Sequence, residues 1–159
     1  MAAKPLIEAK NLKMYFPIGN ALFGKRKLLK AVDDVSLALY PGETFGLVGE
    51  SGCGKTTVGR TLVRLYEPTA GQILFGGADI ASLSENEVLP YRRRMQMIFQ
   101  DPYASLNPRM TVSTIVAEPL KYQGADPKEI ADRVRELIEQ VGLKEDHLNR
   151  YPHEFSGGQ

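Results

Sequence analysis

The chain has 159 residues, 43% of them hydrophobic and 25% charged, with a formal net charge of +1 at pH 7. This ordinary globular composition excludes a disordered or coiled-coil protein, a dedicated nucleic-acid binder and a polybasic membrane anchor. The single cysteine, Cys53, excludes a disulfide framework and a cysteine-built zinc site, and it favours a reducing compartment. No apolar run approaches the ~20 residues that span a bilayer, and no secretory signal is apparent. We therefore expect a cytoplasmic protein that contacts membranes only through partners.

Apolar periodicity predicts a β-rich first third. Alternation over 6–12 and 32–39 indicates two half-buried strands, joined as a hairpin with a long tip, 17–30. The apolar run 44–48 predicts a short strand buried on both faces. Helical spacing over 55–66 predicts a helix directly after a glycine-rich stretch.

The next segment combines strand and turn patterns. We expect a strand over 72–75 and a turn at Gly76-Gly77, followed by a polar segment up to Arg94. A second apolar run, 95–99, predicts another buried strand. The sequence that follows is rich in loop residues.

The last sixty residues have helical periodicity. Thr111 is a suitable cap for a helix that ends at Leu120, and Asp126-Pro127 begins a second helix that Gly142 ends. The composition changes around Asp101. We therefore expect a mixed β/α part over about 1–100 and a helical part over about 101–159.

The segment 49–57, GESGCGKTT, fits the pattern G-x-x-x-x-G-K-[ST] between an expected strand and an expected helix. Its glycines allow backbone N–H groups to surround phosphate oxygens, while the helix adds its positive end. Lys55 would reach the β- and γ-phosphates, and the Thr56 hydroxyl would ligate Mg²⁺. Cys53 faces the phosphates through its backbone and is interpreted as a small filler. The segment predicts a nucleoside triphosphate site.

A phosphate loop alone does not separate kinases, GTPases and transporter ATPases. A second motif, FSGGQ, occupies 155–159. The two motifs together resemble the ATP-binding cassette family, and the segments 95–112 and 151–159 are similar to ATPase subunits of oligopeptide and dipeptide importers. The resemblance covers essentially the whole chain. It implies an α/β P-loop NTPase with an N-terminal antiparallel β subdomain and a helical subdomain.

The resemblance also implies ATP and Mg²⁺ as cofactors, and roles for single residues. The phosphate loop would comprise Gly49, Glu50, Ser51, Gly52, Cys53, Gly54, Lys55, Thr56 and Thr57, and the signature Ser156, Gly157, Gly158 and Gln159. Gln100 would sense Mg²⁺ and the membrane partner, so Lys55 and Gln100 are the catalytic candidates and Thr56 and Gln100 the metal candidates. Phe16 fits the spacing of an adenine-stacking aromatic, with Tyr15 as the alternative.

The implied assembly is a dimer in which the phosphate loop of one subunit and the signature of another enclose each ATP. A second ATPase subunit, two permease subunits and, indirectly, a solute-binding protein would be partners, at the cytoplasmic face of the membrane. The family also carries a strand ending in Asp-Glu and a switch histidine after the signature. His147 and His153 precede it, and Asp101 is rejected as the metal carboxylate. We therefore expect an amino-terminal fragment that is inactive alone.

Other interpretations remain open. A soluble kinase-like P-loop enzyme is the alternative of another class, and importers of nickel or glutathione have similar ATPase subunits. The basic cluster Lys25-Arg26-Lys27 with Lys30 is interpreted as a solvated loop tip. The loop 101–110 either receives a helix of the membrane subunit, as the resemblance implies, or packs as an ordinary compact loop.

Overall fold

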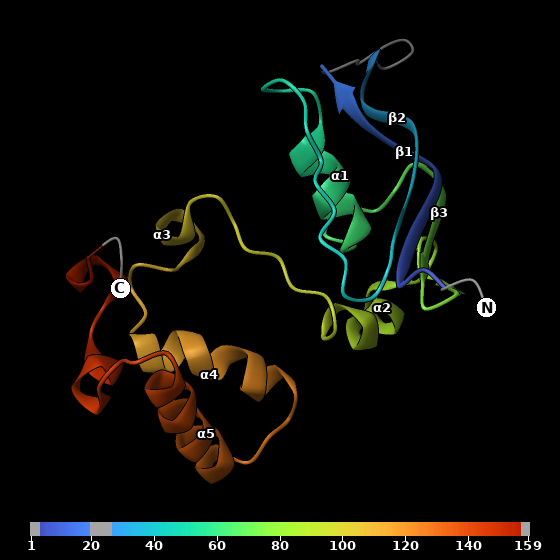
Figure 1. Ribbon diagram of the computed structural model, residues 1–159. Coiled ribbons are helices and arrows are strands. Elements are labelled where there is room, and N and C mark those ends of the chain that lie inside the picture. Colours follow the sequence, from blue (N-terminus) through green and yellow to red (C-terminus); the bar gives the residue numbers. More distant parts are fainter. Residues whose placement is uncertain (1–3, 20–26, 157–159) are drawn as a thin grey trace. The chain divides into compact units, whose positions relative to one another are not determined.

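The structure is a computed structural model that describes residues 4–19 and 27–156. The chain divides into two compact units, Met1–Met97 and Ile98–Gln159 (Figure 1). Part of the basic cluster expected on the hairpin tip, Lys25 and Arg26, lies outside the described residues.

An antiparallel sheet forms the first unit. Its strands are β1 (Ile7–Ile18), β2 (Lys27–Leu39), β3 (Ala70–Phe75) and β4 (Ala78–Asp79), in the order β2-β1-β3-β4. The predicted hairpin is confirmed, with Ile7 opposite Leu39 and Phe16 opposite Leu29. The strands run further into the expected tip than predicted, because ladder pairing continues to Ile18 and Lys27.

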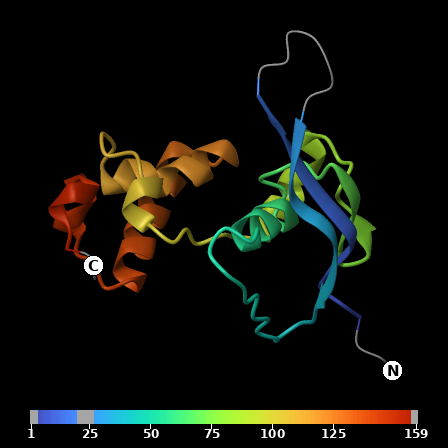
Figure 2. The same ribbon diagram turned by 90° about the horizontal axis from the view of Figure 1, so that it is seen from above.

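Two helices, α1 (Lys55–Leu62) and α2 (Glu85–Arg92), complete this unit beside the sheet (Figures 1 and 2). Val58 of α1 is buried with Met14 and Val32 of the hairpin. A second buried cluster consists of Ala9, Leu12, Ile73, Phe75, Ile80 and Ala81. Leu37 and Leu62 pack against both clusters, so the two form one continuous apolar core.

The helix predicted over 55–66 ends at Leu62, because a tertiary contact turns the chain. Arg64 has a φ of 58° and its side chain is only 3% exposed. Its guanidinium donates to the carbonyl oxygens of Ile80 at 2.9 Å and Leu83 at 2.7 Å. These bonds satisfy a buried cation and fix the end of α1 to the segment after β4.

Helix α2 lies in the polar segment before Arg94, for which the sequence predicted no element. The Glu87 carboxylate accepts hydrogen bonds from the backbone N–H and hydroxyl of Ser84, at 2.9 and 2.6 Å, which lowers the pKa of Glu87. Val88 is fully buried. The pattern Ser84-x-x-Glu87 is a capping-box signature that could have predicted this helix start, but Pro90 within the helix obscured it.

The prediction of two buried strands, over 44–48 and 95–99, is wrong. Neither segment is a strand, and exposure reaches 94% at Val48 and 92% at Ile98. A strand needs a neighbour whose backbone completes its hydrogen bonds, and in the described part of the chain the sheet strands pair only with one another. Apolar composition alone therefore did not produce a strand here.

The second unit is helical. It contains α3 (Pro102–Ser105), α4 (Val112–Tyr122), α5 (Pro127–Gln140) and the 3₁₀ turns η1 (Glu145–Asn149) and η2 (Pro152–Glu154). Both predicted caps are confirmed, since the side chains of Thr111 and Asp126 accept from the backbone N–H groups of Thr114 and Lys128. Ala117, Ile130, Val134 and Ile138 form its core between α4 and α5.

Gly71 of β3 lies against the backbone of β1 at Asn11 and Leu12, and this position can be tested by substitution. Its φ is 93°, and a Cβ would lie 2.5 Å from the carbonyl oxygen of Asn11. Gly77 has nearly the same φ, 90°, but open space around it. We expect Gly77→Ala to lower the free energy of unfolding by about 1–2 kcal/mol through backbone strain alone, and Gly71→Ala by more than about 3 kcal/mol. Urea unfolding of both variants measures this, and equal losses would contradict the close approach.

Candidate functional site

The loop before α1 folds around the Lys55 side chain. The Lys55 ammonium donates to the carbonyl oxygens of Gly49 at 2.7 Å and Glu50 at 2.5 Å, and lies 3.6 Å from the sulfur of Cys53. Cys53 is exposed. The loop is therefore closed by a cation that lies directly at the start of a helix.

The loop depends on glycine at position 54. Gly54 is the N-cap of α1, with a φ of 96°, and a Cβ there would lie 2.3 Å from the carbonyl oxygen of Ala31 in β2. Any larger residue would have to displace either the loop or the strand. The start of α1 is thus set by direct backbone contact with the sheet.

The start of α1 has the electrostatics of an anion site. The first N–H groups of a helix lack intrahelical acceptors, and here they belong to Lys55, Thr56 and Thr57. No acidic residue lies in this turn. The Thr56 side chain is exposed, so its hydroxyl is accessible to a ligand. The positive end of α1 therefore lies beside the Lys55 ammonium and the exposed Thr56. This arrangement suits the binding of phosphate oxygens.

The two candidate aromatic residues have different environments. Phe16 packs against the cluster that contains Val58 of α1, and its ring meets that of Tyr66 edge-on at 5.5 Å. The Tyr15 hydroxyl instead donates to the carboxylate of Asp33. Phe16 is therefore the aromatic that is associated with α1.

Tyr15 belongs to an exposed polar cluster with Asp33 and Lys30. The Lys30 ammonium lies 3.1 Å from the Asp33 carboxylate and 5.3 Å from the centre of the Tyr15 ring. The Tyr15 hydroxyl and the Lys30 ammonium lower the pKa of Asp33, and hydrogen bonding to Asp33 raises the pKa of Tyr15. These contacts with Asp33 and Lys30 account for the position of the Tyr15 side chain.

The second unit contains the other candidates. Gln100 is exposed and follows an apolar segment that is not a strand, contrary to the prediction. Asp101 caps α3 by accepting from the N–H of Ala104 at 3.0 Å, a structural role that agrees with its rejection as a metal carboxylate. The Tyr103 hydroxyl donates to the carbonyl oxygen of Phe155 at 2.9 Å. The segment after Gln100 is therefore bonded to the residue before Ser156.

Only the start of the SGGQ segment can be located. Ser156 is exposed, whereas Gly157, Gly158 and Gln159 lie outside the described residues. The His147 ring meets the Phe155 ring edge-on at 5.6 Å, and the His153 ring stacks on Tyr151. Both histidines thus make packing contacts within 3₁₀ turns.

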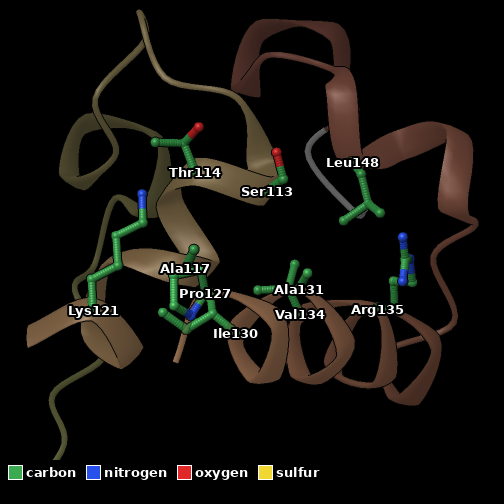
Figure 3. Close-up of a pocket in the computed structure, with 10 residues that line it drawn as sticks. All are labelled: Ser113, Thr114, Ala117, Lys121, Pro127, Ile130, Ala131, Val134, Arg135 and Leu148. Carbon is green, nitrogen blue, oxygen red and sulfur yellow. The ribbon is translucent and has the colours of Figure 1, made fainter. Parts of the chain in front are cut away.

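A cavity of about 290 Å³ lies in the second unit between α4, α5 and η1. Figure 3 shows its lining side chains, with Ala117 and Ile130 from the core and Lys121 and Arg135 on opposite sides. None of its lining residues belongs to either motif. It is a crevice along the helix seam, separate in sequence from the candidate residues.

The contacts of Arg64 and Tyr103 were not predicted from the sequence. Arg64 fixes the end of α1, but a single arginine in a helical pattern gives no sign of burial. Tyr103 was noted only as part of a loop, and its partner lies 52 residues away in the chain.

Comparison with known proteins identifies the family. The pattern of the ABC transporter family matches residues 32–159, a range that includes both motifs. The chain belongs to the ABC transporter family. This membership favours a transporter ATPase over a soluble kinase-like enzyme.

Curated relatives of the chain come from several bacteria. The chain is 55% identical to the oligopeptide transport ATP-binding protein OppF of Bacillus subtilis, over 97% of this chain and 50% of that protein. It is 52% identical to AppF of the same organism, over 97% of this chain and 48% of that protein. The chain thus spans about half the length of the curated relatives that it matches.

Solved structures agree on the fold. A dimeric post-hydrolysis state of the ATP-binding cassette MJ0796, bound to ADP and Pi, superposes with a TM-score of 0.75 at 26% identity, over 96% of this chain and 64% of that one. The α/β P-loop NTPase fold with its antiparallel sheet is therefore confirmed, and the family implies nucleotide binding.

Among residues 4–19 and 27–156, every helix is too short or too polar to cross a bilayer. Within the same ranges, His, Cys, Asp and Glu side chains form no group of three that could hold a metal ion.

The two aromatic residues can be distinguished by nucleotide binding. We expect Phe16→Ala to weaken ATP binding about tenfold, since a stacked base contributes about 1–3 kcal/mol, and Tyr15→Ala to change it less than about twofold. Fluorescent-nucleotide titration measures both, with thermal unfolding as the folding control. A larger loss for Tyr15→Ala would reverse the assignment.

Proposed function

We propose that the chain is the ATP-binding part of the ATPase subunit of an ABC importer that takes up oligopeptides or dipeptides. The observation that carries the proposal is the loop closed by Lys55 at the positive start of α1. The peptide substrate class is supported by the names of the most similar relatives, OppF and AppF. Importers of nickel or glutathione are the alternative within the family.

In this proposal the loop 49–57 binds the phosphates of ATP. Backbone N–H groups at the start of α1 would hydrogen-bond the phosphate oxygens, and Lys55 would exchange its carbonyl partners for the β- and γ-phosphates. Phe16 would stack on adenine and contribute affinity that depends little on base identity. Because phosphoryl transfer depends mainly on positioning and charge stabilisation, Lys55 would also serve catalysis.

Magnesium fits this site. Mg²⁺ prefers oxygen ligands and keeps several waters, so one hydroxyl together with substrate phosphates is a suitable donor set. The hydroxyl of Thr56, an exposed residue, would provide that oxygen, and the family resemblance assigns Gln100 as a second, neutral ligand. The ion would neutralise charge that develops on the phosphates.

The proposed assembly follows the family. Two ATPase subunits would enclose ATP between the phosphate loop of one and the segment 156–159 of the other. The dimeric MJ0796 cassette supports this arrangement. Two permease subunits would bind the ATPase pair at the cytoplasmic face of the membrane, and a solute-binding protein would deliver the peptide.

Nucleotide titration of Lys55→Ala tests the proposed site. Lys55 is the cation closest to the loop carbonyls, and hydrogen bonds to charged groups contribute about 1.5–3 kcal/mol, so ATP affinity should fall more than about tenfold. Lys128→Ala is the matched control, because it removes the same charge from an exposed position on α5. Equal affinity of Lys55→Ala and the unsubstituted protein would refute the phosphate-loop assignment.

Gln100→Ala tests the coupling role in the complete subunit. Gln100 is uncharged, so its contribution to nucleotide affinity should be small, and we expect ATP binding to change less than about threefold. Importer-stimulated hydrolysis should fall more strongly, by about tenfold or more. A large affinity loss with stimulated hydrolysis intact would contradict this role.

A further inference from the structure

The peptide between Phe155 and Ser156 is fixed by several contacts within the second unit. The N–H of Phe155 donates to the carbonyl oxygen of Pro152 at 3.2 Å, and its ring rests edge-on against His147. The Phe155 carbonyl accepts from the hydroxyl of Tyr103 at 2.9 Å. Backbone N–H, ring and carbonyl of one residue are therefore each restrained.

The Tyr103 contact has a particular geometric consequence. The carbonyl of Phe155 and the N–H of Ser156 belong to the same planar peptide unit. A donor that fixes the carbonyl direction therefore also fixes the direction of the Ser156 N–H. Ser156 is exposed, and it is the first residue of the SGGQ segment. The hydroxyl of Tyr103 thus orients the first amide of that segment.

Tyr103 also connects this amide to the other candidate of the second unit. It lies in α3, which begins immediately after the cap residue Asp101 and two residues after Gln100. The ring of Tyr103 is 42% exposed, so the hydroxyl is not needed to satisfy a buried core. The bond joins two segments separated by 52 residues.

We propose that Tyr103 is a positioning residue for Ser156, in which its hydroxyl holds the Phe155–Ser156 peptide and ties it to the loop after Gln100. The proposal rests on the proposed function, in which that segment meets the γ-phosphate of ATP. Tyr103 does not itself touch the nucleotide. It sets the orientation of the peptide at which the segment that would meet ATP begins.

The test uses the complete ATPase subunit with Tyr103→Phe, which removes the hydroxyl and keeps the ring. We expect kcat for ATP hydrolysis to fall about fivefold, as for the loss of one net hydrogen bond, with ATP affinity and melting temperature nearly unchanged. In a Ser156→Ala background, where the segment is already impaired, Tyr103→Phe should have little additional effect. Tyr122→Phe removes a hydroxyl from a ring that is 84% exposed in the same unit and is the matched control.

A second measurement does not depend on hydrolysis. The 15N relaxation order parameter of the Ser156 amide should fall in Tyr103→Phe, because the peptide loses the donor that holds its carbonyl. An unchanged order parameter, additive effects of Tyr103→Phe and Ser156→Ala, or an equal loss in Tyr122→Phe would each overturn the proposal. Absence of Lys55-dependent hydrolysis would instead refute the proposed function, and the order parameter would still report on the Tyr103 bond.

Discussion

The close approach of Gly54 to the carbonyl of Ala31 is the contact on which the phosphate-loop region depends. It places the start of α1 directly on β2, at a distance that leaves no room for a Cβ. The other end of α1 is fixed by Arg64, whose guanidinium binds two carbonyls and whose own carbonyl accepts from Arg92. A helix of eight residues has little stability of its own, so these two attachments and the burial of Val58 hold it in place.

The same attachments explain the conformation of the loop. Lys55 bridges the loop carbonyls because α1 presents its first residue toward them, and α1 does so because both of its ends are fixed to the sheet unit. On binding, Lys55 would leave these carbonyls for phosphate oxygens, while the fixed ends of α1 would keep its first N–H groups in place. The glycine pattern of the motif is thus a requirement of packing against β2 as well as of contact with phosphate.

Local patterns predicted the local features of this chain well. The caps Thr111 and Asp126 and the hairpin were predicted correctly, because each depends on neighbouring residues or on strict alternation. The segments 44–48 and 95–99 were not, because a strand requires a pairing partner that composition cannot reveal. Arg64 and Tyr103 escaped prediction for a related reason, since each acts through carbonyl groups that are distant in the sequence. The motif predicted the loop and its lysine as parts of the candidate site. It did not predict the contacts that hold them in place.

Each unit holds its own candidate residues through contacts within that unit. The loop around Lys55 relies on α1 and the hairpin, while the Phe155–Ser156 peptide relies on Tyr103, His147 and the turn at Pro152. Each unit also has its own buried core. Substitutions that share no partners act nearly additively on stability, so changes in the two units should add in the free energy of unfolding. Under the proposed function, nucleotide affinity would depend on the phosphate loop and turnover on both segments, so substitutions would separate the two quantities.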